Sequence, residues 1–302
     1  MRQFCVKLGL AFVPVLCGCA AAKFYKAPVA NFQSGVNETA STVEPYFTEL
    51  NRMESQYRLF DKVHDSKDWG TEDLKPRFSP ETIQVRVQAL EIIKRYAQLL
   101  SDIAGSTSPD DFQKAADNLG KQTQSLADTV GKLAGAKVPP IGDPLGKLVN
   151  FLGQIKIEHD RKKALEVAIK AGEGPVDELI QALRDDTVTA VALWYEDQKQ
   201  REVIVLGMYN AQRKSATSPD AIEALMKKVL DNSNEAETLR NLPVRNLFDD
   251  FESAHKALVS FAKSGGRPSG VAGLAAQIDV FTQQAKTLSD LVLSLRNVKT
   301  AS

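Results

Sequence analysis

The feature that most constrains the fold is a run of apolar residues near the amino terminus whose spacing alternates between three and four positions. The run comprises Val29, Phe32, Val36, Thr39, Val43, Tyr46, Leu50, Met53, Tyr57 and Phe60. This spacing is the heptad repeat of helices that pack side by side. Pro45 lies inside the run and removes one backbone donor, but the repeat keeps its phase across it. The pattern therefore predicts one long, bent helix.

The same spacing recurs in three further stretches of the chain. One runs from Phe112 to Leu133, and another runs from Val271 to Leu295. Between Ile83 and Ala104, two such repeats lie side by side and form a wide apolar stripe. A helix with a stripe of that width should be central in the fold, with neighbours on two sides.

Helix starts are marked by Ser-Pro-acid sequences. Ser79-Pro80-Glu81, Ser108-Pro109-Asp110 and Ser218-Pro219-Asp220 each supply a capping hydroxyl, a proline for the first turn and a negative charge. Gly174-Pro175 and Arg267-Pro268 are weaker versions of this signal. With the apolar repeats, these signals predict helices over 27–64, 80–104, 109–134, 144–171, 175–214, 219–240, 244–264 and 268–297. Strand signals are nearly absent.

These elements define the expected fold class. It is an all-α, elongated bundle of long, mostly antiparallel helices with coiled-coil-like heptad packing. The chain has 302 residues, and no linker interrupts its body, so residues 27–302 are expected to form one domain. The content of 43% hydrophobic and 25% charged residues is that of a globular protein rather than a disordered one.

The first nineteen residues have the three parts of an export signal. Arg2 and Lys7 provide a positive start, Leu8 to Leu16 form an apolar stretch, and small residues follow at a cleavage point. The apolar stretch is well short of the ~20 residues that a membrane-spanning helix needs, and Pro14 interrupts it. A transmembrane anchor is therefore not expected in this segment.

Leu16-Cys17-Gly18-Cys19 resembles the lipobox of bacterial lipoproteins of the signal peptidase II class. The resemblance implies cleavage between Gly18 and Cys19, lipid on the Cys19 thiol, and acylation of the new amino terminus. Two or three acyl chains would anchor residues 19–26, a short tether, firmly to the membrane lipid. Ala20 stands where an Asp would retain such proteins in the inner membrane. This implies the periplasmic face of the outer membrane if the source is Gram-negative. The alternative is an ordinary signal peptide that contains cysteines.

Cysteine usage and charge agree with export and narrow the range of partners. Cys5 and Cys17 would leave with the leader, so the body would keep no free thiol after lipidation of Cys19. Removal of residues 1–18 takes away two of 38 basic residues and none of 38 acidic residues, which leaves 36 − 38, a net charge of −2. A nucleic-acid partner is not expected, because binding needs a concentrated basic face.

The sequence contains no recognisable catalytic or cofactor-binding motif, so we predict no catalytic residue, cofactor or metal. Glu252 and His255 form one ExxH pair, but a helical di-iron site needs a second pair, which the sequence lacks. We therefore interpret His255 as a surface or packed residue. Trp194 and Val191 share helical spacing, which places Trp194 in the core rather than at a ligand site.

Residues 134–157 depart from the bundle pattern. A Gly- and Pro-rich turn with little charge leads there into a strongly apolar helix start. One interpretation is a connection that packs against the bundle. The other is an exposed apolar tip that enters a membrane or docks a partner, because exposed apolar patches mark such sites. The residues of this candidate tip are Val138, Ile141, Leu145, Leu148 and Phe151.

The function expected from these features is that of a non-enzymatic scaffold or adaptor. Lipid on Cys19 would hold the protein to the membrane. The body would bind another envelope protein along a helix face or at the end remote from the anchor. The alternative function is a membrane-active bundle, pore-forming or bilayer-perturbing, that acts through the apolar hairpin tip 134–152.

Overall fold

A computed structural model describes residues 17–65, 68, 70–71, 75–106, 110–111, 114, 117, 141–154, 160–214 and 218–300. Long helices make up this part of the chain, which contains no strand. The helices are α1 (Cys17–Asp65), α2 (Pro80–Gly105), α4 (Gly142–Gln154), α5 (Arg161–Lys214), α6 (Pro219–Arg240), α7 (Val244–Lys263) and α8 (Val271–Thr300), with the short 3-10 helix η2 (Pro268–Gly270) before α8. The predicted all-α bundle is confirmed.

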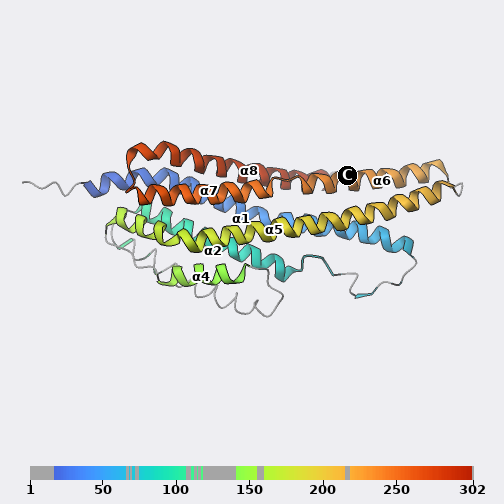
Figure 1. The fold of residues 1–302 in the computed structure, drawn as a ribbon. Helices are drawn as coiled ribbons and strands as arrows, with labels where there is room; N and C mark the ends of the chain where they lie inside the picture. Colours follow the sequence, from blue (N-terminus) through green and yellow to red (C-terminus); the bar gives the residue numbers. More distant parts are fainter. Residues whose placement is uncertain are drawn as a thin grey trace, which may run out of the picture.

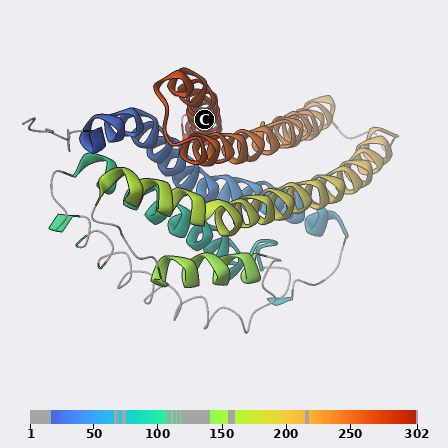
Figure 2. The ribbon, with the colours of Figure 1, turned by 60° about the vertical axis from the view of Figure 1, so that its left-hand side comes forward.

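The helices form an elongated bundle with a wide end and a narrow end (Figure 1). At the wide end, α1, α2, α5, α7 and α8 pack together, and α4 lies on the outside against α5 (Figure 2). Towards the narrow end, α5 continues beside α1 and the chain turns back as α6. We call the α5–α6 hairpin from Thr187 to Arg240 the remote arm, because it lies at the opposite end from the start of α1.

The predicted apolar repeats form the core of the bundle. In α1, every member of the first repeat from Val29 to Met53 is buried. In α2, both parallel repeats are buried apart from Ile83 at the first turn, so the helix is central as expected. In α8, the residues from Leu274 to Val292 of the predicted repeat are buried. The repeat from Phe112 to Leu133 lies outside the described residues.

Two predicted capping sites are confirmed. The Ser79 hydroxyl accepts a hydrogen bond from the Thr82 amide at the start of α2, and Ser218 does the same for the Ala221 amide at the start of α6. Both distances are 3.3 Å. The prolines that follow lie in the first turn, where they have no amide to leave unpaired.

The first helix begins earlier than the predicted residue 27. Helix α1 starts at Cys17, so that residues 19–26, expected as a tether, are helical here. The Tyr25 ring is fully buried and packs edge-on against Phe261, with 4.9 Å between the ring centroids. It also covers Gly266, whose positive φ of 62° favours glycine. A β-carbon at Gly266 would lie only 2.8 Å from the Tyr25 ring. The packing of Tyr25 thus extends the buried core to a residue that precedes the predicted helix start.

The predicted helix start at Gly174-Pro175 is wrong. Helix α5 runs without a break from Arg161 to Lys214, with Pro175 inside it. Buried apolar residues continue at helical spacing on both sides, from Leu165 and Ile169 to Val176 and Leu179. An internal proline costs a helix about 3 kcal/mol or more. Burial of each such side chain contributes about 1.5–3 kcal/mol of stability, and the contributions of several side chains together outweigh that cost.

The preceding connection also differs from the prediction of one helix over 144–171. Helix α4 covers Gly142–Gln154, and α5 begins at Arg161. The Asp160 carboxylate accepts a hydrogen bond of 2.9 Å from the Lys163 amide and so caps the first turn of α5. Asp160, an acidic residue directly before the helix, is thus the sequence signal for the start of α5. The prediction of one helix over 144–171 did not take it into account.

Candidate functional site

The residues of the predicted lipidation site lie at the very start of α1. Cys17, Gly18 and Cys19 form its first turn, whereas Leu16 lies outside the described residues. In the described chain, the buried core begins at Tyr25, six residues after Cys19. Cleavage between Gly18 and Cys19 and lipid on Cys19 stay predictions.

The candidate apolar tip is packed in the described part of the chain. Ile141, Leu145 and Leu148 are buried and belong to the main core, and Phe151 is partly buried against it. Val138 lies outside the described residues. Helix α4 turns these side chains towards α5 and α2. The interpretation of this segment as a packed connection therefore fits the structure, and an exposed tip at Ile141, Leu145 and Leu148 does not.

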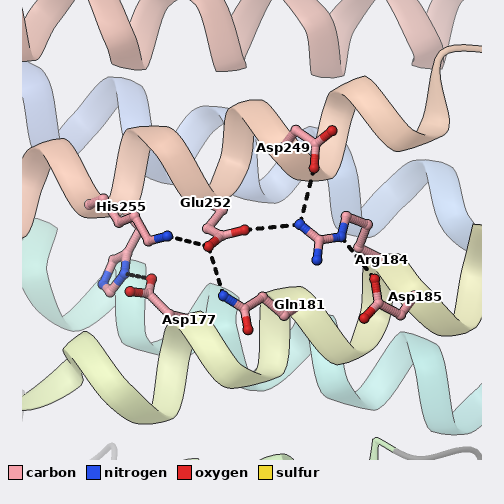
Figure 3. A network of polar contacts seen from close by, with 8 residues as sticks. Asp177, Gln181, Arg184, Asp185, Asp249, Glu252 and His255 are labelled. Carbon is pink, nitrogen blue, oxygen red and sulfur yellow. Dashed lines mark hydrogen bonds and ion pairs between the residues drawn. The ribbon is translucent and has the colours of Figure 1, made fainter.

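A network of charged and amide side chains joins α5 to α7 (Figure 3). Arg184 donates to Asp249 and Glu252, each over 3.1 Å, and Gln181 donates to Glu252 over 2.7 Å. Lys256 also donates to Glu252. Burial opposes ionisation of Glu252, but the hydrogen bonds from Lys256 and Gln181 and the nearby positive charges outweigh it. The net effect is a lowered pKa of Glu252.

His255 points away from this network into the core. Its Nδ1 lies 2.6 Å from Oδ1 of Asp177 on α5, and its Nε2 lies 3.2 Å from the Tyr96 hydroxyl on α2. Both His255 and Tyr96 are fully buried. Burial, and secondarily the charge of Asp177, raises the pKa of Tyr96, which keeps its phenol protonated. With a proton on Nδ1, the His255 ring donates to Asp177 and accepts from Tyr96 at Nε2, so that each polar atom has a partner.

The Tyr96 contact depends on a glycine. A β-carbon on Gly172 of α5 would lie 2.7 Å from the Tyr96 hydroxyl oxygen, so any larger residue would displace the ring. Tyr96, His255 and Asp177 therefore tie α2, α7 and α5 together at one level of the wide end. Glu252 and His255 point to different partners, which does not suit a shared metal ion. His255 is a packed histidine, one of the two alternatives that the sequence left open.

The remote arm has a different surface from the wide end. Val203 on α5 is 70% exposed and Leu230 on α6 is 51% exposed. Tyr195 donates to Glu237, and Ser233 donates to Glu202 over 3.0 Å, which fixes the antiparallel register of α5 and α6. In an antiparallel hairpin, the numbers of two residues at the same level have a constant sum, and the two bonded pairs give about 433. Val203 and Leu230 also have this sum, so they lie at the same level. Val203 directly follows Glu202, and Leu230 lies one turn before Ser233, so both are next to residues that join the two helices.

Further apolar residues extend this exposed pair. Leu206 and Met226 are half-buried on the same two helices, one turn nearer the hairpin tip. We call Val203, Leu206, Met226 and Leu230 the arm patch. On another side of α5, Leu193 and Ile204 are 56% and 50% exposed. The arm therefore exposes large apolar side chains on more than one side.

The interior of the arm is unusually polar. Arg52 of α1 pairs with Glu49 and with Glu235 of α6, and Arg201 of α5 pairs with Glu54 of α1 over 3.5 Å. In the described part of the chain, neither amide atom of the buried Gln198 has a hydrogen-bond partner. Buried polar contacts of this kind give less net stability than apolar packing, since desolvation opposes them. The arm is thus held to α1 less firmly than the wide end is held together.

The arm patch was not predicted from the sequence. Helical spacing would have revealed it, because Val203 falls outside the buried repeat that contains Trp194 and Val205. The register between α5 and α6 was needed to place it beside Leu230.

Comparison with known proteins found no match to any family, to any curated protein or to any solved structure. Over the described residues, no helix is long and apolar enough to cross a membrane. The same residues form no group of three or more potential metal ligands.

Proposed function

We propose that this protein is a lipid-anchored adaptor that binds another envelope protein through the arm patch. The observation that carries the proposal is the exposure of Val203 and Leu230 at one level of a solvent-facing helix hairpin. Single exposed apolar residues are ordinary on protein surfaces, but several large ones at neighbouring positions mark interaction sites.

The position of the patch suits an adaptor. The start of α1 and the remote arm lie at opposite ends of the bundle (Figure 1). Helix α1 is continuous from Cys19 to Asp65, a length of roughly 70 Å at 1.5 Å per residue. A lipid on Cys19 would therefore leave the arm patch far from the anchor and open to a partner.

The chemistry of the patch indicates what the partner must offer. An apolar centre is bordered by charged residues, among them Lys199 and Lys227. Interfaces between proteins commonly combine a buried apolar centre with a polar rim. An apolar patch that spans two antiparallel helices suits the apolar face of a third helix, whose apolar side chains recur every three or four positions. We therefore expect an envelope protein that presents an amphipathic helix.

The arm patch can be tested by site-specific photo-crosslinking in intact cells. A photoreactive residue at Val203 or Leu230 should give the same discrete adduct with one envelope protein. Val280 on α8 is 52% exposed, close to the exposure of Leu230, and serves as the matched control. Charge substitution at the other patch residue, Leu230→Lys with the probe at 203, should reduce the adduct at least tenfold, because a buried charge opposes docking.

Two results would count against the adaptor role of the arm. The first is an equal yield of adducts from positions 203 and 280. The second is an adduct at position 203 that survives Leu230→Lys unchanged while the protein remains folded by circular dichroism.

A further inference from the structure

The end of the bundle that holds the start of α1 is rich in positive charge. The side chains that gather there belong to α1, the α7–α8 connection, the start of α5 and the end of α2. Tyr25 packs against Phe261 and over Gly266, and Arg161 donates over 2.7 Å to the Ser106 carbonyl. Lys263 at the end of α7 donates over 2.7 Å to Glu173 of α5, which holds the end of α7 beside the early turns of α5.

Basic residues outnumber acidic ones at this end. The described cations are Lys23, Lys26, Arg161, Lys162, Lys163, Lys170, Lys263 and Arg267, and the described acids are Asp102, Asp110, Asp111, Asp160, Glu166 and Glu173. Over the described residues, the difference is 8 − 6, or +2. This end therefore carries a modest excess of positive charge.

Most of the acids at this end are already engaged. Glu166 pairs with Lys162 and Lys170, and Glu173 pairs with Lys263. Asp160 caps α5, and Asp102 accepts a hydrogen bond from Gln98. Lys23, Lys26, Lys163 and Arg267 are exposed and form no ion pair with the described residues. We call these four residues the basic end.

The basic end lies close to the predicted lipid. Because α1 is helical from Cys17, Lys23 is only about 6 Å and Lys26 about 10 Å along the helix from Cys19. The first value is below the Debye length of about 8 Å at physiological ionic strength, and the second is slightly above it. Packing of Tyr25 fixes this part of α1 to the turn that carries Arg267. Two of the four cations are thus held next to the anchor, and a third is on the turn packed against them.

We infer that the basic end binds anionic phospholipid headgroups and thereby seats the wide end of the bundle on the membrane surface. This inference rests on the proposed lipid anchor at Cys19, which brings the surface within reach. Basic residues next to an anionic bilayer strengthen membrane contact, by roughly five-fold for each residue in contact. With the wide end seated, the remote arm extends away from the bilayer.

The experiment uses the chain from Cys19 to Ser302, whose only cysteine is Cys19. The thiol is coupled to a maleimide lipid in vesicles of phosphatidylcholine, either alone or with about one-third phosphatidylglycerol. Lysines are then modified with an amine reagent and quantified by mass spectrometry. Chemical coupling makes the result independent of lipidation in cells, so that failure of the proposed anchor and failure of this inference are distinguishable.

Lys23 and Lys26 should react at least five-fold more slowly on the anionic vesicles than on the neutral ones. The difference should vanish in 1 M salt, where the Debye length falls to about 3 Å. Lys227 on the remote arm is exposed and serves as the internal control, with equal rates on both vesicles. The double variant Lys163→Glu/Arg267→Glu should lose the protection of Lys23 and Lys26, whereas Lys214→Glu/Arg245→Glu, changed at exposed sites elsewhere, should keep it.

Equal reaction rates of Lys23 and Lys26 on the two kinds of vesicle would overturn the inference. Protection of Lys23 and Lys26 that persists in Lys163→Glu/Arg267→Glu would also overturn the inference. The protection would then come from closeness to the vesicle surface and would not depend on the charges of the basic end. Protection seen only in native membranes, and absent on anionic vesicles, would assign the basic end to an acidic protein partner instead.

Discussion

Replacement of Arg86 by methionine should lower the free energy of unfolding by about 3–5 kcal/mol, because it leaves the Asp186 carboxylate buried without its partner. Arg86 of α2 contacts Asp186 of α5 through two bonds, Nε to Oδ2 at 2.6 Å and Nη2 to Oδ1 at 3.1 Å. The two side chains are only 5% and 9% exposed. The guanidinium also lies 4.5 Å from the centre of the Phe47 ring of α1.

The double variant Arg86→Met/Asp186→Leu is the informative control. Burial raises the pKa of Asp186, and the charge and hydrogen bonds of Arg86 only partly reverse this. The ion pair therefore does not fully recover what its burial costs. Apolar residues of similar size should restore most of the stability that the single variant loses. Urea unfolding of residues 19–302, followed by circular dichroism, measures both changes. A double variant as unstable as Arg86→Met would contradict this account of the pair.

The same pair predicts the sign of a pH effect. A carboxyl whose pKa is higher in the folded state binds a proton more readily there, so stability falls as the pH rises through the raised pKa. Loss of Arg86 raises the pKa of Asp186 further. The deficit of Arg86→Met relative to the unaltered protein should therefore be small near pH 4 and reach its full size at pH 7. Unfolding curves at the two pH values test this, and an equal deficit at both would contradict it.

Replacement of Trp194 by alanine should cost about 3–5 kcal/mol and should loosen the remote arm in particular. Trp194 is fully buried where α5 leaves the wide end, and its Nε1 donates over 3.2 Å to the Leu50 carbonyl of α1. Beyond this residue, the contacts between the arm and α1 are largely polar. Among the described residues, Trp194 is the largest fully buried side chain, and it is one of the apolar contacts that join the arm to the main core.

The conservative variant Trp194→Phe separates the two contributions of this side chain. It keeps most of the buried ring but removes the hydrogen bond, and we expect a loss of about 1–2 kcal/mol. Hydrogen exchange gives the local readout. In Trp194→Ala, amides of residues 195–240 should exchange faster while those of α7 and α8 change little. A uniform increase over the whole chain would mean that the arm is not a separate, weaker unit.

Much of the fold was predictable because its signals are local. The heptad repeats of α1, α2 and α8 and the caps at Ser79 and Ser218 depend on neighbours in the sequence. Pro175 was misinterpreted because a proline signals a helix start only when tertiary packing does not outweigh its cost. The residues on both sides of Pro175 are buried by other helices. These contacts join segments that are distant in the sequence, so the local pattern does not reveal them.

The candidate sites were less accessible to sequence reasoning. The contact of His255 with Tyr96 and Asp177 joins three helices, and its geometry depends on Gly172, where a side chain would collide with Tyr96. The apolar helix after residue 140 gave two interpretations, since an apolar stripe looks the same whether a neighbour covers it or not. The arm patch and the basic end needed the register and the packing of distant segments.

Mass spectrometry of the amino-terminal peptide tests the proposed lipid anchor at Cys19 most directly. The protein is expressed in bacteria, extracted from the membrane fraction and digested, with Cys19→Ala as the control. The account predicts a chain that begins at Cys19 and carries the added mass of two or three acyl groups, and a variant without that mass. An unmodified Cys19, or residues 1–18 still attached to the membrane-bound protein, would contradict it.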